Sequence, residues 1–100
     1  MSGLDPFRRR LDELDAQIVR ALAERFDVCR EVAEHKRRNA IPMMQGDRVA
    51  QVRERYRSDG HALGLPDDFT SSFFDLLIGA TCQMEDELIA APAGPDTKAP

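Results

Sequence analysis

Two cations share a helical face with apolar residues, and their spacing indicates a site for a small anion. Arg25 and Lys36 are eleven residues apart, which is about three turns, or roughly 16 Å along a helix axis. Eleven steps of about 100° bring the two side chains to within some 20° of each other, so both point the same way. A cation on an apolar helix face is costly unless an anion meets it. Within the chain that anion could be Glu24 or Glu85 for Arg25, and Lys36 could extend to solvent instead.

Arg8 lies too far from Arg25 to share a ligand with it inside one chain. It precedes Arg25 by seventeen residues, about 25 Å along a straight helix and turned well away from it. The two could meet one ligand only if a second copy of the helix ran antiparallel. Taken alone, Arg8 also suits an exposed surface. Together with Arg48, these cations favour a site for a small polyanion.

A long helix over about residues 5–38 must position the first three cations. Apolar residues recur there in steps of three and four, the period of an amphipathic helix: Phe7, Leu11, Leu14, Ile18, Leu22, Cys29 and Val32. We expect Asp5 to be its N-cap and Pro6 its first helical residue. Helices average about a dozen residues, so this length indicates a coiled coil or an intertwined dimer.

Two further helices are expected after the break at Pro42, which disfavours helical geometry in the residue before it. Asp47 should cap a short helix over 48–59, and a helix of medium length should run from about 66 to 90. The chain shows no strand pattern, so we predict an all-α fold. Residues 1–90 should form one helical domain, and the Pro- and Ala-rich residues 91–100 a disordered tail.

Composition narrows the class of protein. A chain of 100 residues with a net charge of −4 buries a modest core, so a second copy would help it, and its acidity argues against a nucleic-acid partner. Cys29 and Cys82 fall in apolar patterns, which predicts buried, reduced thiols. We expect no metal or cofactor. The chain contains neither a signal-peptide pattern nor an apolar run of the roughly 18 residues that cross a bilayer, which predicts a soluble, cytoplasmic protein without membrane contact.

The charged positions and their surroundings resemble the all-helical chorismate mutases over residues 5–90. The resemblance rests on Arg8, Leu11, Leu14-Asp15, Ile18, Leu22-Ala23-Glu24-Arg25, Val32, Lys36, Pro42, Arg48, Gly64-Leu65, Leu77-Ile78 and Thr81. It implies an intertwined homodimer of three-helix chains, with one long, one short and one medium helix. It also implies that each site borrows an arginine, here Arg8, from the partner chain.

The resemblance further implies a role for each cation. Arg8 and Arg25 would bind the two carboxylates of a chorismate-like dianion, since a guanidinium pairs with a planar carboxylate through two hydrogen bonds. Lys36 would donate to the ether oxygen, Arg48 would line the ring side, and Thr81 would stand near a carboxylate. Such a site supports a [3,3] rearrangement through orientation and fixed electrostatics, with neither a nucleophile nor a metal.

Three positions depart from the family's pattern and bear on the substrate. Val49 stands where chorismate-specific members carry a glutamate that holds the ring hydroxyl, and Gln45 where an aspartate is common. Glu85, a catalytic candidate with Arg25 and Lys36, replaces a glutamine that donates to the ether oxygen. A glutamate donates only when protonated, and the opposed Lys36 favours its ionised form. An ionised Glu85 could instead attract a cationic group of the substrate.

Two sub-families resemble the chain at these departures. Isochorismate-pyruvate lyases also place a valine after the arginine of the second helix. The 4-amino-4-deoxychorismate mutases of antibiotic pathways resemble it more closely, through 41–45, 48–49 and 81–88. Our leading hypothesis is the rearrangement of 4-amino-4-deoxychorismate to 4-amino-4-deoxyprephenate, with Gln45 accepting a hydrogen bond from the C4 ammonium. Chorismate mutase, the lyase and a catalytically silent helical dimerisation or regulatory module remain alternatives.

Overall fold

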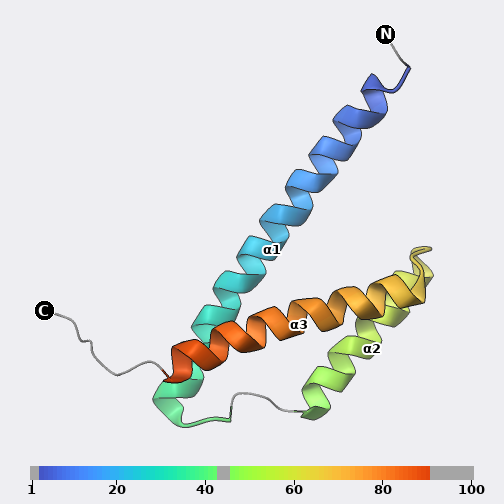
Figure 1. The fold of residues 1–100 in the computed structure, drawn as a ribbon. Helices are drawn as coiled ribbons and strands as arrows, with labels where there is room; N and C mark the ends of the chain where they lie inside the picture. The colour runs from blue at the N-terminus through green and yellow to red at the C-terminus, as the bar shows by residue number, and fades with distance from the viewer. Residues whose placement is uncertain (1–2, 43–45, 91–100) are drawn as a thin grey trace, which may run out of the picture.

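Three helices make up the described part of the chain, which comprises residues 3–42 and 46–90 of a computed structural model (Figure 1). Helix α1 spans Asp5–Asn39, α2 spans Gly46–Ala62 and α3 spans Asp67–Ala90. They contain 35, 17 and 24 residues, and the described ranges hold no strand. The prediction of an all-α fold with one long, one short and one medium helix is confirmed.

Helix α3 joins the other two helices. It packs against the C-terminal half of α1 and along α2, whereas the N-terminal half of α1 projects beyond them (Figure 1). The fully buried Phe74 of α3 anchors the α2 contact, and its ring centroid lies 4.9 Å from that of Tyr56. Ala33 and Leu77 are the other buried hydrophobic residues in the described ranges. A chain with so small a core leaves most of α1 without an internal partner.

Helix α1 ends close to the predicted position but begins one residue earlier than expected. Ala40 adopts the left-handed conformation (φ 55°), and the next amide donates to the carbonyl of Lys36 at 3.0 Å. At the other end the prediction of Asp5 as N-cap is wrong. Leu4 occupies that position without a side-chain hydrogen bond, and Asp5 lies inside the first turn, 3.7 Å from the Arg8 guanidinium.

Helix α2 is longer than the predicted span 48–59, and Gly60 explains why. A Cβ atom at Gly60 would lie 2.8 Å from the Oγ1 of Thr70, so this glycine permits close packing against α3 and does not stop the helix. The helix ends instead at Ala62. Gly64 beyond it is left-handed (φ +87°), and the Leu65 amide donates to the Gly60 carbonyl at 2.8 Å, a Schellman ending. Asp47 lies within the first turn, so its predicted capping role is also wrong.

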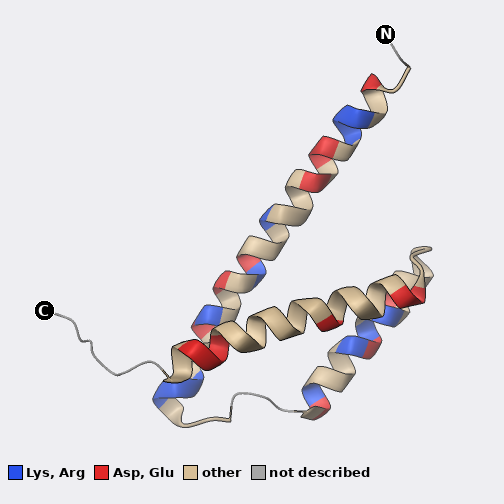
Figure 2. Ribbon diagram, in the orientation of Figure 1, with Lys and Arg blue, Asp and Glu red and all other residues tan. Residues whose placement is uncertain are grey.

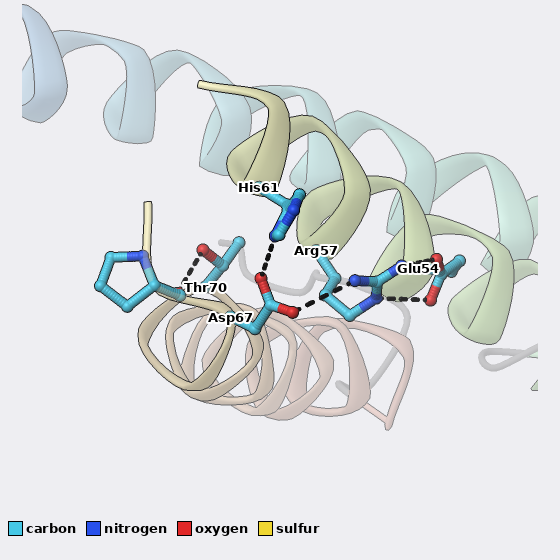
Figure 3. Close-up of polar contacts among 6 residues, drawn as sticks. Glu54, Arg57, His61, Asp67 and Thr70 are labelled. Atoms are coloured by element: carbon cyan, nitrogen blue, oxygen red, sulfur yellow. Dashed lines mark hydrogen bonds and ion pairs between the residues drawn. The ribbon is translucent and has the colours of Figure 1, made fainter. Parts of the chain in front are cut away.

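Ion pairs fix α2 against α3. Arg57 and His61 both contact the Asp67 carboxylate, at 3.3 and 3.1 Å, and Arg57 also pairs with Glu54 (Figure 3). The hydrogen bond from His61 is the largest cause of the lowered pKa of Asp67. These contacts hold the N-terminus of α3 at the end of α2, which sets the register between the two helices.

The structure does not test the remaining predictions about the fold. Gln45 and the tail over 91–100 lie outside the described residues. Within the described ranges, no helix is both long and apolar enough to cross a membrane. The predicted cytoplasmic location stays a prediction.

Candidate active site

A cavity of about 460 Å³ is lined by residues of all three helices, and its volume is within the size range of small-molecule sites. Its lining combines aliphatic side chains with a few charged and polar groups. The lining residues are Arg25, Val28, Cys29, Val32 and Lys36 of α1, Arg48, Val49 and Val52 of α2, and Phe74, Ile78, Thr81, Cys82 and Glu85 of α3.

Helix α1 supplies one wall through a single face. Arg25, Cys29, Val32 and Lys36 lie at steps of four, three and four residues, the spacing that aligns side chains on a helix. The Nη1 of Arg25 donates to the Sγ of Cys29 at 3.8 Å. Within the described ranges Arg25 forms no ion pair with a carboxylate, so its guanidinium is available to a ligand.

Helix α3 supplies the opposite wall and the cavity's carboxylate. The Nζ of Lys36 lies 3.4 Å from the Oε1 of Glu85, and the two side chains are only 18% and 11% exposed. In Figure 2 the acidic C-terminal end of α3 crosses the basic C-terminal end of α1 at this pair. Next to it, the buried Thr81 hydroxyl donates to the carbonyl of Leu77 at 3.0 Å. This wall therefore offers a carboxyl group beside a hydroxyl group.

Helix α2 closes the third side with Arg48, Val49 and Val52. Arg48 belongs to the first turn and is exposed, so it lies at the rim, whereas Val49 is half-buried. An apolar side chain here can pack against a substrate ring but cannot hydrogen-bond to it. Among the described residues of α2, this wall therefore offers no hydrogen-bond acceptor for a ring substituent.

The charge balance of the cavity favours an anionic ligand. Its lining holds the cations Arg25, Lys36 and Arg48 against the single carboxylate of Glu85. Apolar walls strengthen such a field, because they exclude the water that would screen it. The excess of two positive charges suits a dianion.

Both thiols line this cavity, which corrects the expectation that they are buried in a core. Cys29 and Cys82 are free and partly exposed. Burial is the largest cause of the raised pKa of each thiol, and the nearby Glu85 carboxylate adds to it. The signal was present in the sequence, because Cys29 lies on the helical face that carries Arg25 and Lys36.

Six of the eight predicted site residues line the cavity: Arg25, Lys36, Arg48, Val49, Thr81 and Glu85. Arg8 does not. Its side chain is exposed next to Asp5 on the projecting half of α1, away from the cavity. Gln45 cannot be placed, because it precedes the first described residue of α2.

In a comparison with known protein families, residues 7–86 match the family described as chorismate mutase type II. The chain belongs to the type II chorismate mutase family. Membership makes it an isomerase of the chorismate mutase type, whose substrate is a small chorismate-like molecule. The cavity, with its excess of positive charge, is of the right size and polarity for such a ligand.

Several curated proteins are similar to this chain. A protein of Streptomyces pristinaespiralis named 4-amino-4-deoxychorismate mutase is 40% identical over 95 residues, which cover 92% of this chain and 71% of the relative. A protein of the same name from Streptomyces venezuelae is 32% identical over 83% of this chain and 81% of its own length. The chorismate mutase of Methanocaldococcus jannaschii is 28% identical over 75% of this chain and 76% of its own length. None of the solved structures matches the chain significantly.

Proposed function

We propose that this chorismate-mutase-type enzyme rearranges 4-amino-4-deoxychorismate to 4-amino-4-deoxyprephenate. The observation that carries the proposal is the cavity in which Arg25, Lys36 and Arg48 face Glu85 beside the apolar Val49. The names of the two Streptomyces relatives support the choice of substrate. The reaction is intramolecular: the ether C–O bond breaks while a C–C bond forms, and no group leaves.

The cations act by position and charge. Arg25 binds one substrate carboxylate, and Lys36 donates to the ether oxygen, where negative charge grows as the C–O bond breaks. Holding the enolpyruvyl arm over the ring requires both contacts at once, which lowers the entropy cost of the reactive geometry. Their fixed separation on one face of α1 suits this task.

We assign the second carboxylate to Arg8 of a partner chain, because Lys36 serves the ether oxygen and Arg48 lies at the rim of the cavity. Arg8 lies about 25 Å along the axis from Arg25. The apolar residues near it on α1 are exposed, Phe7 by 66%, Leu11 by 56% and Ile18 by 54%. A second copy packed antiparallel on this face would cover these side chains and carry the partner's Arg8 to the cavity. The enzyme is therefore a homodimer in our proposal.

The apolar wall at Val49 accounts for the preference over chorismate. A hydroxyl at C4 of the ring finds no acceptor on this side chain, so the site gains little from binding chorismate itself. Gln45 remains the proposed acceptor for the C4 ammonium of the amino substrate, and the negative charge of Glu85 adds a favourable long-range field for that cation.

A side-by-side rate comparison tests the substrate. Purified protein is assayed on 4-amino-4-deoxychorismate, chorismate and isochorismate, and pyruvate release is followed in parallel through coupled lactate dehydrogenase. We expect kcat/KM for the amino substrate to exceed that for chorismate by at least about 100-fold, the effect of an unpaired polar group in a closed site, with no pyruvate formed.

Each of the other outcomes would assign a different function to this chain. Equal or faster turnover of chorismate would make the chain an ordinary chorismate mutase. Pyruvate release from isochorismate would make it a lyase. If no substrate were turned over and none raised the melting temperature, the chain would be a silent member of the family.

A further inference from the structure

Cys29 occupies a position between the two cations of the α1 wall that the proposed mechanism does not use. It lies four residues after Arg25 and seven before Lys36, and its side chain lines the cavity with theirs. The Nη1 of Arg25 donates to its sulfur at 3.8 Å, within the range of a hydrogen bond to sulfur. Among the described residues no carboxylate pairs with Arg25, and the Cys29 thiol accepts a hydrogen bond from its guanidinium.

The Cys29 thiol also interacts with Glu85 of α3. Burial raises the pKa of Cys29 most, and a hydrogen bond to the Glu85 carboxylate raises it further, while Arg25 and Lys36 lower it. The group therefore stays a neutral thiol, which can accept a hydrogen bond on sulfur and donate its proton at the same time. Of the groups that face it, Arg25 and Lys36 come from α1 and Glu85 from α3, while Arg48 lines the same cavity from α2.

We propose that Cys29 is a positioning residue of the active site, whose sulfur holds the Arg25 guanidinium in the orientation that receives a substrate carboxylate. The inference rests on the proposed function, since it concerns the same dianion. Cys29 need not touch the substrate. Its effect passes through Arg25, with Glu85 fixing the thiol from the other side.

The physical reason is the length of the arginine side chain. A free Arg side chain loses rotamer entropy when it is ordered, and a ligand that must order it binds more weakly. A contact that orders the guanidinium beforehand removes part of that cost. A neutral sulfur does so without consuming the charge, whereas a carboxylate in its place would compete with the substrate.

The test compares Cys29→Ala with Cys29→Ser on whichever chorismate-like substrate the wild-type dimer turns over. A carboxylate contact acts in both ground and transition states, so its loss raises KM more than it lowers kcat. We expect Cys29→Ala to raise KM by about five-fold, with kcat within roughly two-fold. Cys29→Ser, whose hydroxyl can accept and donate in the same way, should stay within about two-fold of the wild type in both constants.

Two controls separate positioning from a structural effect. Ser72→Ala removes a polar group of similar size from an exposed position of α3 that does not line the cavity, and should change KM by less than about two-fold. In a variant that already carries Arg25→Lys, adding Cys29→Ala should change KM by less than about two-fold, because the guanidinium that Cys29 positions is absent.

The kinetic results can overturn the positioning role of Cys29 without overturning the proposed function. Equal KM values for the wild type and Cys29→Ala would overturn the positioning role while leaving the enzyme's activity established. The positioning role would also be overturned if the effects of Cys29→Ala and Arg25→Lys on KM were fully additive, or if Cys29→Ser and Cys29→Ala raised KM equally. A wild-type chain without turnover or binding of any chorismate-like dianion would overturn the proposed function and this inference together.

Discussion

The two halves of α1 have the same sequence pattern and opposite surroundings. In the C-terminal half, Ala33 is fully buried against α3, and Arg25 and Lys36 line a cavity. In the N-terminal half, the stripe through Leu11 and Ile18 is more than half exposed, and the helix projects away from α2 and α3 (Figure 1). An amphipathic period indicates that a face needs a partner, but it does not say whether that partner lies in the same chain.

The contrast extends to the arginines of the two halves. Arg25 is half-buried and contacts a neutral sulfur at 3.8 Å, whereas Arg8 is exposed and lies 3.7 Å from an acid one turn away. Surface pairs of the second kind contribute at most about 1 kcal/mol, so Arg8 can leave Asp5 for a stronger partner. This contrast is consistent with our proposal that both arginines bind one dianion, each from a different chain.

The largest expected effect comes from the packed half. Arg25→Ala should lower kcat/KM by about 1,000-fold, because a buried charge partner of the substrate is lost. Steady-state kinetics measure this, and circular dichroism checks that the helix content is retained. Arg30→Ala serves as the control, since Arg30 lies on the exposed side of the same half and pairs with Asp27. A loss of less than ten-fold in Arg25→Ala would remove this residue from the site.

A charge on the projecting half tests whether its apolar stripe is an interface. Ile18→Asp places a carboxylate on the stripe, whereas Ala16→Asp places one on the opposite side of the same exposed segment. Burying an unpaired charge costs several kcal/mol, so Ile18→Asp should yield monomers and lower activity by about 100-fold. Sedimentation velocity gives the mass. Dimers that persist in Ile18→Asp, or dissociation in both variants, would argue against this face.

Replacing Glu85 by glutamine tests the role of the acid in the packed half. The Glu85 carboxylate lies 3.4 Å from the ammonium of Lys36, and in our proposal its negative charge favours the C4 ammonium of the amino substrate. An amide keeps the shape of the side chain but removes the charge. We expect Glu85→Gln to lower kcat/KM for 4-amino-4-deoxychorismate by about five-fold, while kcat/KM for chorismate changes by less than about two-fold. An unchanged rate on the amino substrate would show that the negative charge is not needed.

The smallest expected effect concerns the ion pair that holds α2 on α3. Arg53 contacts both oxygens of Asp75, at 2.8 and 3.0 Å, and this hydrogen bonding lowers the pKa of Asp75 from its ordinary 3.8. A lowered folded-state pKa gives stability that is present above 3.8 and is lost as the pH falls through the depressed value. Asp75→Asn should lower the Tm by roughly 2 °C at neutral pH and by a smaller amount at pH 2.

A matched acid on α2 controls for the general effect of charge. Asp59 is exposed and has no ion pair among the described residues, so Asp59→Asn should leave the Tm unchanged at both pH values. An equal shift in both variants would assign the effect to net charge and not to the contact with Arg53.

The sequence was sufficient for most of the fold because the relevant signals are local. Hydrophobic period and Pro42 predict α1 and its end, and the acids after Pro66 predict the start of α3. Gly60 misled the prediction for α2, since a glycine that permits close packing looks the same as one that ends a helix. Only the distance to Thr70 distinguishes the two.

The candidate site was predictable in its cations but not in its contacts. Arg25 and Lys36 stand out because charge interrupts an apolar stripe. The Lys36–Glu85 pair joins residues 49 positions apart, and the Arg25–Cys29 hydrogen bond depends on rotamers. Neither follows from spacing. Arg8 remains a prediction, because its role depends on a second chain.

Mixing two inactive variants tests the assignment of the two arginines most directly. Arg8→Ala and Arg25→Ala are each purified, unfolded together in equal amounts, refolded and assayed. If Arg8 acts in the partner's site, each mixed dimer has one intact site, and random pairing should restore about one quarter of wild-type activity. If the mixture stays as inactive as its two components, Arg8 does not complete the site of a partner chain.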